Sequence, residues 1–185
     1  LHAKMISPSK LVYVDSDGNE ITLTNPEDIK RLGEEEASFR RGVLMSDETL
    51  STLVDLSIKE LNRLREESGE KRLKIIASAL NYGHCIQIKE AFLARNLRAD
   101  YVHSNEDGAV NDRVFSKLEN HELDVIVQSK MLGEGFDHKF LSVAMVGSVF
   151  SNLSPFVQFV GRVMRVVKQN SPGDLVNRGV VVFHV

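Results

Sequence analysis

The stretch "KIIASALNYGHCIQIKEAFLARNLRADYVH", residues 74–103, contains two short apolar segments separated by a longer amphipathic one. Residues 74–80 and 99–103 have the length and composition of strands, whereas residues 83–97 have the pattern of a helix. Strands that alternate with helices indicate βαβ units, in which a parallel sheet is covered by helices on both faces. The stretch therefore predicts an α/β fold.

The same alternation continues to the end of the chain. The sequence predicts further helices at 111–120 and 155–167, and further strands at 123–128, 143–149 and 179–183. Upstream, Ser46 can cap a helix whose first turn holds Asp47 and Glu48 and which ends near Gly69. Residues 46–185 are thus expected to form one domain with a mainly parallel sheet.

The segment before this domain has a different character. Residues 11–24 combine two β-prone runs with a turn-rich centre, which predicts a hairpin, and residues 25–45 are strongly charged. We expect residues 1–45 to be a connector with a hairpin and a short helix. Because the chain begins without Met and ends within an apolar run, we expect a piece of a longer protein, truncated within the domain 46–185.

Composition excludes several classes of protein. The chain has 185 residues, of which 42% are hydrophobic, and no run approaches the roughly 20 apolar residues of a membrane span. Cys85 is the only cysteine, so no internal disulfide can form, and a cytoplasmic location is expected. The six histidines show no ligand spacing, so no metal site is predicted. The net charge is −3, with the acidic excess before residue 70 and a mild basic excess after it, too small to establish nucleic-acid binding.

One loop is placed to bind a ligand. Parallel sheets bind ligands at the carboxyl ends of their strands, and "SKMLGEGFDHK", residues 129–139, follows one such end. Gly133 and Gly135 allow the backbone to approach a ligand closely, and Asp137 can accept a hydrogen bond from a ribose. Glycine-rich turns are common, so this signal alone is weak.

The segment "QFVGRVMR", residues 158–165, is more specific. Gln158, Arg162 and Arg165 fall on one stripe of the predicted helix, with Gly161 between them. No acidic residue occurs from 154 to 169, and two guanidinium groups without a carboxylate suit an anion such as phosphate. The alternative is a solvated arginine face with a chance glycine.

Four motifs in order resemble those of superfamily 2 helicases. "QFVGRVMR" is similar to motif VI, "GEGFD" (133–137) to motif V, "KIIASALN" (74–81) to motif IV, and "YVHS" (101–104) to motif IVa. The resemblance extends from about residue 46 to the end of the chain. It is strongest to DEAD/DEAH-type helicases and restriction-type translocases, and it concerns their second RecA-like domain, a three-layer α/β sandwich.

The resemblance implies an ATP site at a cleft between two RecA-like domains. The sequence contains no G-x-x-x-x-G-K-[ST], so the phosphates and Mg²⁺ would be held by a first domain elsewhere in the full-length chain. Arg162 and Arg165 would act as arginine fingers on the γ-phosphate, and Gln158 would orient them. The other residues expected to face ATP are Gly133, Glu134, Gly135, Asp137 and Gly161.

The resemblance also implies a nucleic-acid partner, with DNA favoured over RNA. Asn81, His103, Ser104 and Ser129 are polar residues at predicted strand ends and suit phosphate contacts. The full-length protein is expected to be an ATP-dependent helicase, and the isolated chain to be inactive. Two alternatives stay open: the translocating subunit of a restriction enzyme, and a non-catalytic RecA-like nucleic-acid-binding module.

Overall fold

The chain divides into two compact units, Leu1–Arg40 and Arg41–Val185. The computed structural model describes residues 11–14, 20–23, 41–129, 137–149, 153–163, 167–171 and 173–183. In the first unit, β1 (Leu11–Val14) and β2 (Glu20–Leu23) pair antiparallel, with Leu11 opposite Leu23. The predicted hairpin is confirmed.

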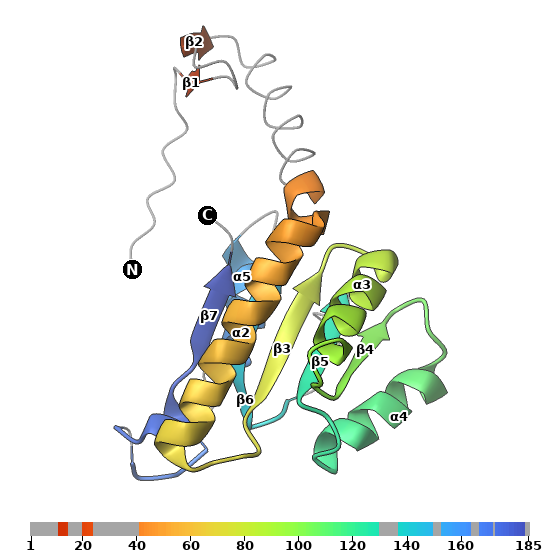
Figure 1. The fold of residues 1–185 in the computed structure, drawn as a ribbon, viewed down its shortest axis with the longest axis vertical. Helices are drawn as coiled ribbons and strands as arrows, with labels where there is room; N and C mark the ends of the chain where they lie inside the picture. Colours follow the sequence, from red (N-terminus) through yellow and green to blue (C-terminus); the bar gives the residue numbers. More distant parts are fainter. Residues whose placement is uncertain are drawn as a thin grey trace. The chain divides into compact units, whose positions relative to one another are not determined.

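The second unit is built on a five-stranded sheet in the order β4-β5-β3-β6-β7 (Figure 1). Every neighbouring pair in this sheet is parallel. The strands are β3 (Lys74–Ala79), β4 (Ala99–His103), β5 (Val125–Ser129), β6 (Leu141–Gly147) and β7 (Val180–Phe183). The α/β fold with a parallel sheet, predicted from the alternation of strands and helices, is confirmed.

Helices cover both faces of this sheet and make three layers. They are α2 (Asp47–Ser68), α3 (Tyr82–Leu93), α4 (Gly108–Glu119) and α5 (Leu153–Gly161). Residues 41–45 are also helical, and a 3₁₀ turn, Leu175–Asn177, precedes β7. The part of the chain that the structure describes contains no helix long and apolar enough to cross a membrane.

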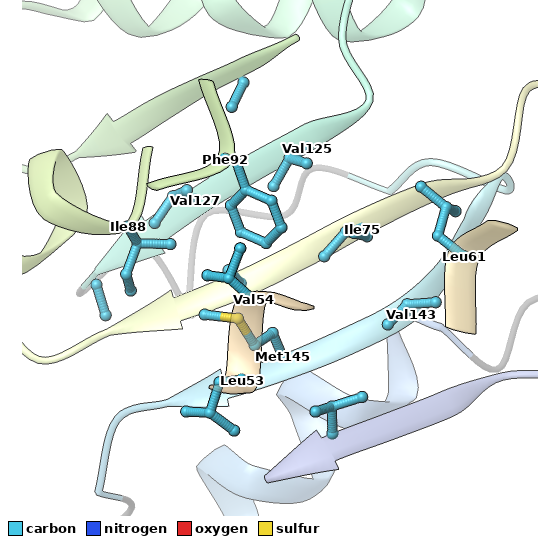
Figure 2. Close-up of a cluster of buried hydrophobic side chains, with 14 of the residues drawn as sticks. Leu53, Val54, Leu61, Ile75, Ile88, Phe92, Val125, Val127, Val143 and Met145 are labelled. Atoms are coloured by element: carbon cyan, nitrogen blue, oxygen red, sulfur yellow. The ribbon is translucent and has the colours of Figure 1, made fainter. Parts of the chain in front are cut away.

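Two apolar cores form because successive strand residues point to opposite faces. Ile75 of β3 belongs to the core under α2 and α3, and Ile76 belongs to the core under α4 and α5. α2, drawn in orange, lies in front of the sheet in Figure 1, and Figure 2 shows Leu53, Val54 and Leu61 from this helix. The close-up also shows their partners Ile75, Ile88, Phe92, Val125, Val127, Val143 and Met145.

The ends of α2 follow from local chemistry. Ser46 is the N-cap, and its hydroxyl accepts a hydrogen bond from the backbone N–H of Thr49 at 3.4 Å. Gly69 ends the helix in the left-handed conformation, with φ of 71°. Glycine enters this conformation without the steric penalty of a side chain. Both predicted ends are confirmed.

Two other helices end earlier than the sequence predicts. α3 ends at Leu93 rather than near residue 97, and Asn96 follows in the left-handed conformation, with φ of 62°. α5 ends at Gly161 rather than at residue 167, and Arg162 and Val163 form a turn. Asparagine tolerates the left-handed conformation and glycine weakens helices, so both endings have a local cause that the apolar periodicity conceals.

Candidate functional site

The predicted nucleic-acid residues lie at one edge of the sheet. Strands β4, β5 and β3 are neighbours and run parallel, so their carboxyl ends lie together. His103 and Ser129 end β4 and β5, with Ser104 directly after His103. Asn81 follows the end of β3 and is the N-cap of α3. Ligands of parallel α/β folds bind at such an edge.

Asn81 and Ser104 are the exposed members of this group. The side-chain oxygen of Asn81 accepts a hydrogen bond from the backbone N–H of His84 at 2.9 Å. This bond fixes the side chain at the start of α3, so its NH₂ group is the part that can meet a ligand.

His103 and Ser129 are buried, with 1% and 3% of their surfaces exposed. His103 accepts a hydrogen bond from the N–H of Asn105 at 2.9 Å, and its backbone pairs with the side chain of Asn111. The side chains of these two residues are therefore covered, and their contact with phosphates stays a prediction. Ser129 is buried with the rest of β5. His103 takes part in the turn after β4, and this turn presents Ser104.

Of the glycine-rich loop, residues 129–139, the structure describes residue 129 and residues 137–139. Gly133, Glu134 and Gly135 lie outside the described residues, and Asp137 is exposed. His138, its neighbour, is 4% exposed and packs with its ring against His121 and Phe140, 5.7 Å away from each between ring centroids. Burial lowers the pKa of His138, so a neutral ring is favoured there.

The end of α5 holds a buried guanidinium group. Phe159 and Val163 are 0% and 2% exposed and pack into the core under α4 and α5, whereas Gln158 is exposed. Arg162 is 8% exposed and follows the helix directly. The sequence predicted that Arg162 shares a helical stripe with Gln158. In the structure, Arg162 lies in a turn after the helix and is buried. Arg165 lies outside the described residues.

Gly161 has open space beside it. A Cβ atom added at this position would meet no atom of the described residues within 4 Å. Packing among the described residues therefore does not require glycine at this position. A guanidinium group can pair with phosphate oxygens through its fork of N–H donors.

The described residues do not fit a resident metal. They contain no group of three or more His, Cys, Asp or Glu side chains that could hold an ion. Divalent cations such as Mg²⁺ require oxygen ligands, above all carboxylates. This part of the chain can contribute to a phosphate site but does not itself supply a Mg²⁺ site.

A further group at the same edge was missed by the sequence analysis. Tyr82, the first residue of α3, and Tyr101 of β4 both donate their hydroxyl hydrogens to Oε1 of Glu106, at 2.8 and 2.6 Å. The two phenol oxygens are 3.1 Å apart. We name Tyr82, Tyr101 and Glu106 the tyrosine–glutamate cluster. No spacing in the sequence signals it, because Tyr82 of α3 lies 19 residues from Tyr101 and 24 from Glu106.

Comparisons with known proteins identify the family and the fold. Residues 53–167 match the helicase conserved C-terminal domain. Among solved structures, Mss116p DEAD-box helicase domain 2 bound to an RNA duplex has a TM-score of 0.52 at 16% identity, covering 72% of this chain and 50% of that one. S. cerevisiae Dbp5 bound to RNA and ADP BeF3 has a TM-score of 0.53 at 14% identity, covering 72% and 32%. No curated protein matches the sequence.

A third solved structure is the Pyrococcus furiosus Hef helicase domain, with a TM-score of 0.50 at 15% identity. The match covers 73% of this chain and 24% of that one, so the chain spans only part of these larger proteins. At such identities the structures establish the fold, and the match over residues 53–167 establishes the family. The chain belongs to the helicase conserved C-terminal domain family and has the fold of the second RecA-like domain of superfamily 2 helicases.

Proposed function

We propose that the chain is the second motor domain of an ATP-dependent nucleic-acid helicase or translocase and works with a first RecA-like domain. The observation that carries this proposal is the placement of Arg162, which is almost fully buried directly after Gly161, where an added Cβ atom would meet none of the described residues within 4 Å. Both residues lie within the segment that matches the helicase family.

Arg162 would serve as an arginine finger. ATP, when bound between the two domains, supplies a γ-phosphoryl group that is transferred to water. The packing of Phe159 and Val163 on either side of Arg162 in sequence holds the backbone that carries its guanidinium group. A preorganised cation stabilises the charge of the transition state without a cost of reorganisation. Arg165 is proposed to act beside it.

The remaining nucleotide contacts are proposed from the hydrogen-bonding groups of each residue. Gln158 is exposed on α5 and would orient the arginine side chains through hydrogen bonds. Asp137, also exposed, would accept a hydrogen bond from the ribose. Gly133, Glu134 and Gly135 would approach the nucleotide through their backbone. Mg²⁺ is assigned to the first domain.

Nucleic acid would cross the edge that carries Asn81 and Ser104. Their polar side chains can contact phosphates, and such contacts position a strand without reading its sequence. The solved structures of Mss116p domain 2 and Dbp5 contain RNA, which supports nucleic acid as the partner. They give no support to the preference for DNA, so RNA is the first probe to use.

The test is ATP turnover by a protein in which the chain follows a first RecA-like domain. We expect Arg162→Lys to lower kcat about 10³-fold while ATP binding changes much less, because lysine keeps the charge but loses the fork. Arg63→Lys is the matched control, since Arg63 of α2 has a half-exposed side chain that pairs with Glu60 and Glu67.

Turnover of the Arg162→Lys protein near that of the control would overturn the arginine-finger proposal. The nucleic acid that stimulates turnover also separates the two motor types. Stimulation by duplex DNA but not by single strands would favour the restriction-type translocase.

A further inference from the structure

The tyrosine–glutamate cluster presents one aromatic ring to solvent. Tyr82 is 37% exposed and stands directly after Asn81 at the carboxyl edge of the sheet. Tyr101 is more covered, and the ammonium group of Lys89 lies 5.6 Å from the centroid of its ring. Tyr82 is therefore the member of the cluster that can meet a ligand.

The ring of Tyr82 is held in place. Its hydroxyl is bonded to Glu106, and its ring stands almost perpendicular to those of Tyr101 and His103, at centroid distances of 5.8 and 5.2 Å. A side chain that is already ordered loses little conformational entropy when a ligand covers it. A fixed, partly exposed ring is thus suited to binding a flat group.

The charge of the cluster indicates which flat group fits. The hydrogen bonds from Tyr101 and Tyr82 lower the pKa of Glu106, so its carboxylate is ionised at neutral pH. A negative charge beside Tyr82 disfavours a phosphate at this point. Both phenol hydrogens are already donated to Glu106, so they are not available to read hydrogen-bonding groups of a ligand. The surface favours an uncharged aromatic ligand bound through its face.

We propose that Tyr82 is a stacking platform for one unpaired nucleobase. This inference rests on the proposed function, since the backbone of the same strand would pass Asn81 and Ser104, which are close in sequence to Tyr82 and Glu106. Stacking on an aromatic side chain tolerates any base, because every base has a π face. The platform would therefore hold one base of the strand without selecting its sequence.

The test uses the 185-residue chain and fluorescence anisotropy. The probes are a labelled single-stranded oligouridylate of about 12 nucleotides, its DNA equivalent, and a series with one abasic site at each position in turn. We expect one abasic position to weaken binding to the wild type about 10-fold. Tyr82→Leu should weaken binding to the intact probe by a similar factor and remove the effect of that abasic site.

Two further variants serve as controls. Tyr82→Phe keeps the ring and should bind within about threefold of the wild type. Leu93→Ala removes an exposed apolar side chain at the other end of α3, 40% exposed, and should bind as the wild type does. Circular dichroism checks that Tyr82→Leu is folded, and if it is not, the abasic series on the wild type decides alone.

The outcomes separate this inference from the proposed function. If the wild type binds the intact probes and no abasic position weakens binding, the stacking platform is wrong and nucleic-acid binding stands. If Tyr82→Leu weakens binding but leaves the abasic profile unchanged, Tyr82 acts only through the fold, and the inference again fails. If the wild type binds neither RNA nor DNA, nucleic-acid binding by this chain is wrong and the inference with it.

Discussion

Lys74 is a buried lysine at the start of β3. It is 1% exposed, and its ammonium group donates a hydrogen bond to the carbonyl oxygen of Leu123 at 2.6 Å. Burial lowers its pKa from 10.5 to about 8; the nearby Arg98 and Arg65 add to this shift, and Asp124 and Glu119 oppose it. The folded state therefore penalises the charged form of this side chain.

A Lys74→Met variant tests this penalty through its dependence on pH. Between pH 8 and about pH 10 the unfolded chain keeps the lysine proton and the folded chain loses it, so wild-type stability should rise with pH. We expect the stability of Lys74→Met relative to the wild type to fall by about 2–3 kcal/mol from pH 7 to pH 10. Denaturant unfolding at several pH values measures it, and a constant difference would contradict the shift.

Asp124 joins three elements at the amino edge of the sheet. It accepts hydrogen bonds from Arg65 of α2 at 2.8 Å and from the side chain of Arg98, before β4, at 3.0 Å. The backbone N–H of Arg98 donates to the same carboxylate, also at 3.0 Å. Burial alone would raise the pKa of Asp124, but the bonds from Arg98 and Arg65 outweigh burial and hold it well below its ordinary value.

We expect Asp124→Asn to lower the free energy of unfolding by about 2–4 kcal/mol at pH 7, because it leaves two arginine side chains without their carboxylate. The side chain of Arg98 is 57% exposed and can be hydrated, which limits the loss in the free energy of unfolding. Because the pKa is depressed in the folded state, the wild-type advantage should be full above about pH 4 and decline as pH falls below it.

Glu67→Gln is the matched control for this substitution. Glu67 pairs with Arg63 on the exposed side of α2, where ion pairs contribute little, so the variant should stay within about 0.5 kcal/mol of the wild type. Equal losses from both substitutions would show that Asp124 has no special part in joining the elements.

At the scale of the elements, Gly179 allows β7 to approach the end of α5. A Cβ atom at this position would lie 2.4 Å from the carbonyl oxygen of Val163 and 3.1 Å from its carbonyl carbon. Both are backbone atoms of the residue that follows Arg162, so they cannot yield by a rotamer change. The contact therefore links the start of the last strand to the proposed arginine finger.

We expect Gly179→Ala to cost about 1–3 kcal/mol of stability, because it overpacks a closed contact. The same variant should lower ATP turnover in a protein that includes a first RecA-like domain, since it displaces the turn that holds Arg162. Gly173→Ala is the control, because a Cβ there meets nothing within 4 Å among the described residues. Normal stability and turnover of Gly179→Ala would show that the turn can move without consequence.

The elements themselves were predictable from local sequence, and the polar contacts between them were not. β-branched runs such as 125–127 identified strands, and Ser46 and Gly69 identified the ends of α2. The bond from Lys74 to Leu123 joins residues 49 apart, and the one from Arg65 to Asp124 joins residues 59 apart. Local periodicity carries no information about such pairs, because they depend on the order of strands in the sheet.

The candidate site, too, was predictable only where local sequence or the parallel sheet determines it. The motifs identified the segment that contains Gln158, Gly161 and Arg162, and the parallel sheet placed Asn81 and Ser104 at one edge. Burial of His103 and Ser129 was not predictable, since a polar residue at a strand end can be either exposed at the edge or covered by the helices on the faces of the sheet. The tyrosine–glutamate cluster was missed for another reason: Tyr82 and Glu106 are 24 residues apart in the sequence.

At the scale of the whole molecule, the 185-residue chain should bind nucleic acid but not hydrolyse ATP. It contains no phosphate-binding loop, and its described residues contain no cluster that could hold Mg²⁺. Arginine fingers stabilise charge that develops on a nucleotide already held by another domain, so they contribute nothing alone. We expect steady-state turnover at background in an ATPase assay, with or without single-stranded RNA.

Addition of a first RecA-like domain, joined to the chain before residue 1, should restore turnover and make it depend on Arg162. The same joined protein with Arg63→Lys should keep its turnover, which separates the arginine finger from general surface charge. Robust turnover by the chain alone, unaffected by Arg162→Lys, would mean that the nucleotide site lies within these 185 residues. The assignment of phosphate and Mg²⁺ binding to a first domain would then be wrong.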